Sequence, residues 1–199
     1  MKITFLGATG TVTGSKYLLT SESSQGDEKR VLIDCGLFQG LKQLRLRNWA
    51  ALPINPQEIQ TVILTHAHID HSGYLPLLVK NGFSGKVYCT EATRDLCEVL
   101  LLDAAYLQEE EARYANKGGF SKHTPALPLY TQEDAQKAIA LLTPVPYEQD
   151  IDLGDGLFAK LYPNGHILGS AFVRIHNQKT SIVFSGDIGR PHDILMKAP

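Results

Sequence analysis

The sequence predicts an α/β chain (α+β by some schemes) on three observations. Residues 2–6, 30–33 and 61–64 form short apolar runs of β type. Residues 91–116 contain no glycine or proline and repeat apolar side chains at helical spacing, which indicates one long helix. Further strand-like runs follow at roughly 156–162, 170–176 and 180–185. Strands and helices therefore share one chain.

Length and composition are those of a globular protein. The chain has 199 residues, 43% hydrophobic and 20% charged, which is enough to bury a core in a single domain. Its net charge of −2 excludes the overall basic field of many nucleic-acid binders, although a neutral protein can still carry a local basic cleft.

Cysteine usage and the absence of a leader-like pattern bear on the compartment. The three cysteines are widely spaced and form no C-x-x-C pair, which favours a reduced chain over a disulfide framework or zinc ribbon. The first residues show no basic region followed by an apolar core, and no apolar run approaches the ~20 residues of a membrane span. We therefore expect a cytoplasmic protein.

The N-terminal region reads as a glycine-built hairpin. Residues 2–6 and 16–19 are strand-like, and the turn between them holds Gly7, Gly10 and Gly14. This spacing matches neither the dinucleotide nor the P-loop fingerprint, and a strand follows it, so a nucleotide-binding loop is disfavoured. Residues 21–29 should form an exposed turn.

The next segment ends a strand on a carboxylate. In residues 30–36, Asp34 follows an apolar run, where an unpaired charge is costly to bury. Asp34 is therefore either at an exposed strand end or hydrogen-bonded behind the loop that follows the next strand. Residues 41–52 have the apolar spacing of a helix that Pro53 ends, and 59–64 are a second strand.

The densest chemical signal lies at residues 66–71. His66, His68, Asp70 and His71 form an H-x-H-x-D-H array directly after a strand, and no packing argument asks for such an array. Imidazole and carboxylate groups are good ligands for Zn²⁺ and Mn²⁺. His66 and His68 point to one side of an extended segment. Ser72 is a candidate N-cap for a helix at 74–79.

The second half adds two more candidate ligands at strand ends. After a strand at 86–90 and the long helix, Thr131 caps a helix expected to run to residue 142 before Pro144. His166 lies between the strand-like runs 156–162 and 170–176, and Asp187 follows 180–185. His123 has no ligand-type neighbours and is interpreted as an ordinary surface residue. His176 and His192 are alternatives as ligands, although each is better explained as a surface histidine.

Four motifs in order resemble the metallo-β-lactamase superfamily, specifically its β-CASP branch of RNA-processing nucleases related to the cleavage and polyadenylation endonuclease. They are residues 1–15, 63–73, 164–170 and 184–190, which together span nearly the whole chain. The resemblance implies an αββα sandwich. It also implies a metal-dependent hydrolase, an endonuclease or 5′-exonuclease that cleaves RNA phosphodiesters with a hydroxide activated by two metals.

The resemblance also implies roles for individual residues. One metal would be held by His66, His68 and His166, the other by Asp70 and His71, with Asp187 bridging; these six would form the catalytic centre. Asp34 would orient the ligand loop from behind. Two Zn²⁺ per complete site are expected, and Mn²⁺ remains an alternative.

Part of the family's pattern is not found in these residues. The family takes a further histidine from far downstream, beyond an inserted cap domain that supplies much of the surface for single-stranded RNA. We therefore expect residues 1–199 to be the N-terminal part of the domain, without the cap and C-terminal half. On that expectation the isolated chain is weakly active or inactive, and an exposed apolar face favours self-association.

Two other classes of function stay open at this point. One is a different hydrolase of the same fold, such as a glyoxalase-type thioesterase, a lactamase or a tRNA 3′-processing enzyme. The other is a non-catalytic subunit of an RNA-processing complex, in which ligand residues are typically lost; here all six are present.

Overall fold

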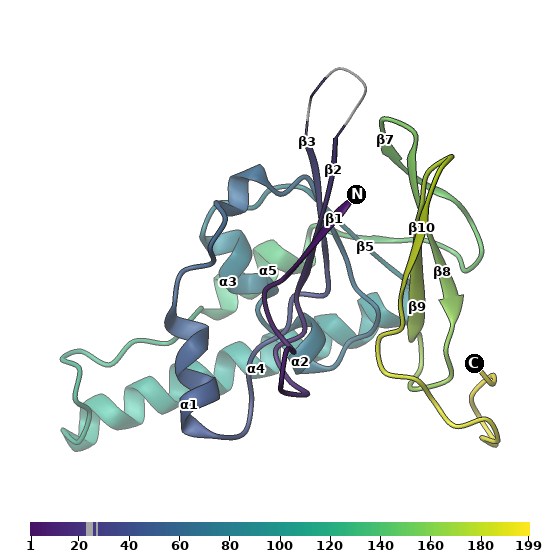
Figure 1. Cartoon of the computed structure of the whole chain (residues 1–199). Coiled ribbons are helices and arrows are strands. Elements are labelled where there is room, and N and C mark those ends of the chain that lie inside the picture. The colour runs from purple at the N-terminus through teal and green to yellow at the C-terminus, as the bar shows by residue number, and fades with distance from the viewer. Residues whose placement is uncertain (23–25, 27) are drawn as a thin grey trace.

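The computed structural model describes residues 1–22, 26 and 28–199 and contains two β-sheets stacked face to face, with helices on one side (Figure 1). The six-stranded sheet has the order β1-β2-β3-β4-β5-β6: β1 Lys2–Phe5, β2 Tyr17–Glu22, β3 Glu28–Ile33, β4 Thr61–Ile63, β5 Lys86–Cys89 and β6 Leu142–Pro144. The four-stranded sheet has the order β10-β9-β8-β7: β7 Ile151–Gly154, β8 Leu157–Pro163, β9 Ala171–His176 and β10 Ser181–Phe184.

The first sheet places the ends of its central strands at one edge. β1, β2 and β3 pair antiparallel, whereas β3, β4, β5 and β6 run parallel to one another. Parallel strands end at the same edge of a sheet, so Asp34 after β3 and Thr65 after β4 emerge together. This edge carries the candidate site.

The two sheets share one apolar core. Strands β8 and β9 alternate buried and less buried residues, so one face of each is directed inward. Side chains from both sheets interlock between them, including Leu19, Ile33 and Ile63 from the first sheet and Leu161, Val173 and Phe184 from the second. This core holds the loops at the ends of β8 and β10 next to the edge of the first sheet.

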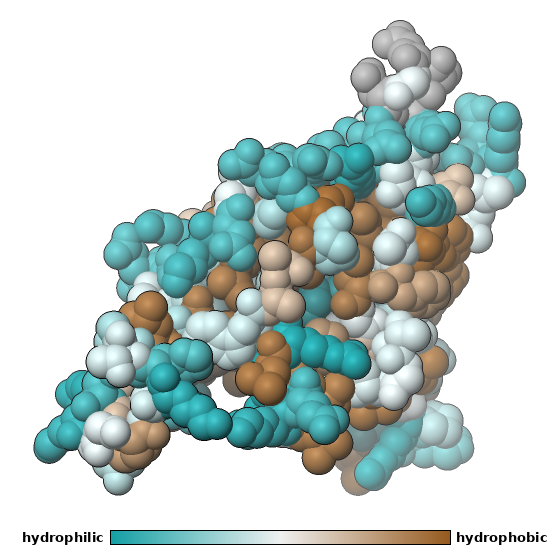
Figure 2. Space-filling view, turned by 60° about the vertical axis from the view of Figure 1, so that its left-hand side comes forward, coloured by the Kyte–Doolittle hydropathy of each residue, from teal (hydrophilic) through white to brown (hydrophobic). Residues whose placement is uncertain are grey.

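A second core lies on the other face of the first sheet, under the helices. The helices are α1 Lys42–Arg45, η1 Leu46–Trp49, η2 Pro56–Glu58, α2 Ile69–Ser72, α3 Leu75–Lys80, α4 Glu91–Gly118 and α5 Gln132–Ile139. Helix α4 continues beyond the sheet, and Gly119 ends it in the left-handed conformation (φ 65°). Figure 2 shows the helical side, where apolar patches remain between hydrophilic residues.

The mixed α/β class and the long helix predicted from sequence are confirmed. The three cysteines are free and buried. Among the described residues, none of the helices combines the length and apolar character needed to cross a bilayer.

The single helix predicted at 41–52 is wrong. The segment forms only α1 and the 3₁₀ turn η1, and Leu41, Leu46 and Trp49 are exposed. The apolar spacing was misleading because these side chains have no core to pack on. Asn48 instead binds the backbone of Phe38, accepting from its N–H and donating to its carbonyl, each at 2.8 Å, which fixes the turn.

Other boundaries also differ from the predictions. Ser72 ends α2 and caps no following helix; its hydroxyl donates to the carbonyl of Ala67 (2.8 Å).

The helix expected to reach residue 142 ends at Ile139, because residues from Leu142 pair with β5 as a strand that was not predicted. Strand β7 was also missed. The turn predicted at 21–29 is shorter, since β2 reaches Glu22 and β3 begins at Glu28; residues 23–25 and 27 lie outside the described residues.

Lys16, just before β2, is a buried cation that the sequence did not single out. It is 1% exposed, donates to the carbonyl of Gly36, and has its Nζ 4.7 Å from the ring centroids of both Phe38 and Tyr74. Burial lowers the pKa of Lys16 to about 8, against which the nearby Cys35 acts only weakly. Aromatic faces and one carbonyl stabilise the ammonium only in part.

Replacing Lys16 with Met should remove a pH dependence of stability. The lysine pKa is lower in the folded than in the unfolded chain, so its ionisation destabilises the fold at pH 7, and this penalty shrinks as pH rises through 8. The free energy of unfolding of the protein relative to Lys16→Met should therefore rise by about 1 kcal/mol between pH 7 and pH 9. Urea unfolding of both proteins at the two pH values measures this difference. An unchanged difference would contradict the assignment, and comparing the two proteins cancels the titration of the buried thiols.

Candidate metal centre

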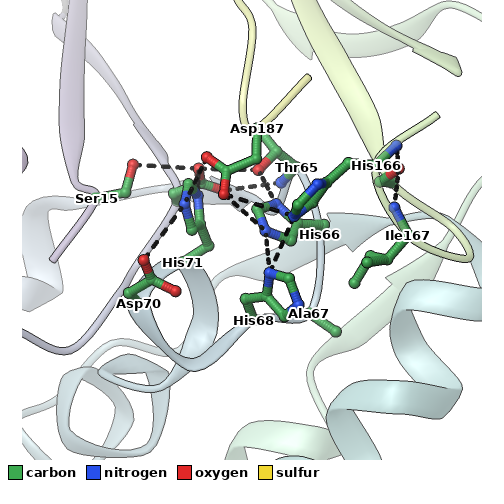
Figure 3. A network of polar contacts seen from close by, with 12 residues as sticks. Ser15, Thr65, His66, Ala67, His68, Asp70, His71, His166, Ile167 and Asp187 are labelled. Carbon is green, nitrogen blue, oxygen red and sulfur yellow. Dashed lines mark hydrogen bonds and ion pairs between the residues drawn. The ribbon is translucent and has the colours of Figure 1, made fainter. Parts of the chain in front are cut away.

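Three imidazoles from two distant segments meet at the edge of the first sheet (Figure 3). His66 and His68 follow β4, and His166 lies on the loop between β8 and β9. His68 Nδ1 is 3.0 Å from His66 Nε2 and 3.2 Å from His166 Nε2. The structure thus brings together residues that are 98 positions apart in the chain.

Asp187 joins this cluster from the loop after β10. Its Oδ2 lies 3.9 Å from His66 Nε2 and 3.5 Å from His166 Nε2. Its other oxygen, Oδ1, lies 3.3 Å from His71 Nε2. The carboxylate therefore faces the three imidazoles with one oxygen and His71 with the other. Its side chain is 46% exposed, so the site is open to solvent on this side.

Asp70 and His71 complete the group from the short helix α2. His71 Nε2 lies 3.9 Å from the nearer carboxylate oxygen of Asp70, and both side chains lie on the same side of α2 as Asp187 (Figure 3). All six predicted site residues are therefore close together. The sequence prediction placed Asp70 and His71 on a loop, whereas they lie in the four-residue helix α2.

Asp34 lies directly behind this group. It is 1% exposed, which excludes the alternative that it sits at an exposed strand end. Its carboxylate accepts hydrogen bonds from the Thr65 backbone N–H (2.8 Å), the Thr65 hydroxyl (2.9 Å) and His71 Nδ1–H (2.6 Å), with Ser15 Oγ at 3.4 Å. A buried carboxylate that accepts this many hydrogen bonds holds its partners in place.

These hydrogen bonds select which ring nitrogens face the site. Because His71 donates from Nδ1 to Asp34, its Nε2 carries the free lone pair directed toward Asp70 and Asp187. The Thr65 hydroxyl donates to Asp34 and can then accept from His66 Nδ1–H at 3.0 Å, which leaves His66 Nε2 free. Sequence reasoning missed Thr65, since a lone threonine after a strand carries no distinctive signal.

Motif residues 164–170 tie the second sheet's loops to the first sheet. The side chain of the buried Asn164 donates from Nδ2 to the backbone carbonyl of Ser185 (3.0 Å). The backbone carbonyl of Asn164 accepts from Gly189 N–H (2.8 Å). Ser170 Oγ accepts from the N–H of His166 (3.1 Å). Ala171 N–H donates to the carbonyl of Thr65 (2.8 Å), which connects the loop to the first sheet. Backbone geometry thus fixes where His166 and Asp187 point.

The electrostatics favour neutral imidazoles at His66 and His166, and act in the opposite direction at His71. Burial, followed by the nearby His71, His68 and His166, lowers the pKa of His66 to about 2. Burial also lowers the pKa of His166. Burial alone would lower the pKa of His71, but the hydrogen bond and charge of Asp34, with the charges of Asp187 and Asp70, outweigh it and raise that pKa. The raised pKa favours a protonated ring, so a cation at His71 Nε2 would have to displace a proton. Neutral nitrogen lone pairs are what a metal ion needs from histidine.

The donor geometry fits a divalent cation. Two imidazole nitrogens bound tetrahedrally to Zn²⁺ at 2.0–2.1 Å lie ~3.3 Å apart. The separations of 3.0 and 3.2 Å around His68 are close to this value. One donor atom from each of His66, His68, His166 and Asp187 lies within 4.8 Å of every other. Asp70 and His71 face the opposite side of Asp187 and can supply donors for a second cation.

The remaining histidines lie away from the site. His176 stacks on Phe158, with ring centroids 5.8 Å apart, and its Nε2 is 3.9 Å from Asp150. His123 and His192 are exposed on loops. Neither they nor His176 belongs to the metal-type cluster found among residues 1–22, 26 and 28–199.

The sequence matches the metallo-beta-lactamase superfamily over residues 12–199. The chain belongs to this superfamily. The resemblance inferred from the four motifs is thereby confirmed. Relatives of this chain include a ribonuclease and transcription termination factors.

The curated relatives are longer than this chain. A ribonuclease of Thermus thermophilus is 38% identical over 98% of this chain but only 40% of its own length. Transcription termination factor FttA of Methanosarcina mazei is 34% identical over 94% of this chain and 27% of its own length. Integrator complex subunit 11 of Danio rerio is 27% identical over 97% of this chain and 30% of its own length.

Solved structures of the superfamily share the fold. A metallo-beta-lactamase mutant of Cronobacter sakazakii covers 97% of this chain with a TM-score of 0.54 and 21% identity, matching 62% of that chain. The metallo-beta-lactamase fold protein YhfI of Bacillus subtilis covers 93% of this chain with a TM-score of 0.51 and 16% identity, and the match spans 62% of the YhfI chain.

Asp34→Asn should weaken metal binding without unfolding the protein. The neutral amide of Asn can still accept a hydrogen bond from the Thr65 backbone N–H. It cannot accept a charge-assisted hydrogen bond from His71 Nδ1–H, so the bond that orients His71 is lost. We expect a 10- to 100-fold loss in Zn²⁺ affinity, measured by competition with a zinc-binding dye. Asp150→Asn is the control, because Asp150 pairs with Lys160 away from the site. An affinity for Asp34→Asn within twofold of the control would contradict the role of Asp34.

Proposed function

We propose that this chain carries the metal centre of a ribonuclease, which hydrolyses RNA phosphodiesters with two divalent cations, Zn²⁺ in the first instance. The observation that carries the proposal is the convergence of six ligand-type side chains, Asp187 among them, from three separate segments of the chain. The names of the relatives, a ribonuclease and transcription termination factors, favour RNA over the other substrates of the superfamily.

In this proposal the residues divide into two sets. His66, His68 and His166 would hold one cation, Asp70 and His71 would hold the other, and Asp187 would be shared between them. Support comes from the opposite directions of the two Asp187 oxygens, toward His66 and His166 on one side and His71 on the other. Mn²⁺ would suit the same oxygen and nitrogen donors.

The protein's own groups prepare the site in three ways. The low pKa of His66 keeps its Nε2 unprotonated at neutral pH. Asp34 holds His71 through Nδ1 and Thr65 through two bonds, so the ligand groups need little rearrangement. When bound, a pair of such cations lowers the pKa of water and offsets charge on the attacking and leaving oxygens of a phosphodiester.

Substrate access is provided by a groove of about 430 Å³ that reaches the cluster. Its wall includes His71 and Asp187 together with Val12 of the glycine-rich hairpin, which is 93% exposed. An extended polymer can reach the carboxylate of Asp187 along this groove. The groove lies between β1 and β10, since residues of both strands line it.

The chain spans two fifths or less of the length of these curated relatives. That residues 1–199 form the N-terminal part of a larger nuclease, with a cap domain elsewhere, stays a prediction. So do weak activity of the isolated chain and its self-association.

Substrate class and site assignment can be tested in one experiment. The product of the complete reading frame, loaded with Zn²⁺, is offered end-labelled single-stranded RNA, a glutathione thioester and a β-lactam. We expect RNA cleavage that EDTA stops and Zn²⁺ restores, and a loss of at least about 100-fold in Asp187→Asn, because both cation sites share that carboxylate.

His176→Ala is the matched control, since this histidine lies outside the cluster and should leave cleavage unchanged. Thioester or lactam hydrolysis with intact RNA would assign another hydrolase of this fold. Stoichiometric zinc with no turnover of any substrate would favour a non-catalytic role.

A further inference from the structure

Residues 41–50 form a basic segment that the metal centre does not use. Lys42, Arg45 and Arg47 fall within ten residues that contain no acidic side chain, in a chain whose net charge is −2. All three are exposed on α1 and η1. We call residues 41–50 the basic platform. It concentrates positive charge in one place on an otherwise slightly acidic protein.

The platform also exposes apolar surface. Leu41 is 73% exposed, Leu46 57% and Trp49 59%. Trp49 is the one tryptophan of the chain, and an indole ring at this exposure contributes little to the core. Exposed aromatic and aliphatic groups between cations are typical of surfaces that bind single-stranded nucleic acid, where bases stack on rings and cations contact phosphates.

The platform's cations are not engaged in ion pairs. Most other arginines contact a carboxylate: Arg30 pairs with Glu28 and Glu58, Arg94 with Asp95, and Arg113 with Glu110. Within the part of the chain that the structure describes, Lys42, Arg45 and Arg47 form no salt bridge. Their charge is therefore available to an anionic ligand from outside.

Hydrogen bonds connect the platform to the segment that leads to Asp34 and α2. The buried Asn48 of η1 makes two 2.8 Å bonds to the backbone of Phe38, and the Arg47 guanidinium lies 5.4 Å from the Phe38 ring centroid. One residue earlier, Leu37 N–H donates to the carbonyl of Ile69 in α2 (2.9 Å). Phe38 is only four residues from Asp34, a reach of at most ~14 Å. Figure 1 shows α1 and α2 at the same end of the first sheet.

We propose that the basic platform is a docking site for single-stranded RNA, with Arg45 and Arg47 contacting phosphates and Trp49 stacking on a base. The proposal rests on the proposed function for its choice of ligand, since a hydrolase of RNA needs to hold the strand beside its cations. The carboxylates of an acidic peptide would pair with the platform's cations but would offer no base to stack on the exposed indole ring of Trp49, so RNA is favoured. The platform would hold nucleotides beyond those at the groove.

The test measures binding without cleavage. A 5′-fluorescein-labelled 12-nucleotide single-stranded RNA is titrated with protein in EDTA, and anisotropy gives the affinity at several salt concentrations. Arg45→Glu/Arg47→Glu should bind at least tenfold more weakly, and the slope of log K against log salt should fall by about 1.4, since each phosphate contact on a single strand contributes about 0.7. Trp49→Ala should lose about tenfold with the slope unchanged.

Lys86→Glu/Lys179→Glu is the matched control, because it makes the same change in net charge at two exposed lysines outside the platform. Its affinity should stay within about threefold of the parent protein. Far-UV circular dichroism and thermal melting confirm that each variant is folded. If both double variants lose affinity equally, binding follows net charge and the platform is not a site.

The outcomes separate this proposal from the proposed function. If the parent binds RNA and neither Arg45→Glu/Arg47→Glu nor Trp49→Ala weakens it, the platform is excluded while RNA hydrolysis remains open. If the platform variants weaken RNA binding but the complete protein cleaves no RNA, the platform stands and the hydrolase assignment fails. An acidic peptide that binds the platform more tightly than RNA would overturn the choice of ligand.

Discussion

The hydrogen bonds accepted by the buried carboxylate of Asp34 are the constraint on which the site depends. This one group joins the end of β3, the loop after β4 and helix α2, through bonds to Thr65 and His71. Leaving a carboxylate buried without such donors costs several kcal/mol, so the three segments are held in one arrangement. The same bonds decide which nitrogens of His66 and His71 are free to bind a cation.

The core between the sheets performs the complementary task. It brings the loops after β8 and β10 to the edge where β3 and β4 end, and the bond from Ala171 to Thr65 fixes their separation. Asn164, buried between those loops, joins the loop of His166 to the loop of Asp187 through its side-chain bond to Ser185 and its backbone bond to Gly189. The candidate metal ligands lie on loops and on the short helix α2, and hydrogen bonds hold these segments at the ends of packed strands, which limits reorganisation when a cation binds. The basic platform is attached to the same frame through Asn48.

Much of the site was predictable because ligand chemistry is dense and specific. Four ligand-type residues in six positions, and two more at strand ends, predicted the cluster that the fold assembles. Thr65 was not predictable, since its role arises only when Asp34 and His66 lie on either side of it. The prediction of a single helix at 41–52 was wrong because the spacing of apolar residues does not show whether the segment has a core to pack on. Strand β6 was missed because its partner β5 is more than fifty residues earlier.

The claim that these side chains enclose cations is tested most directly by anomalous diffraction at the zinc edge from crystals grown with Zn²⁺. The account predicts a peak ~2.0–2.1 Å from His66 Nε2, His68 Nδ1 and His166 Nε2. A second peak, on the side of Asp70 and His71, would share Asp187 with the first. Zinc bound only at other positions, with the three imidazoles unliganded, would contradict the account.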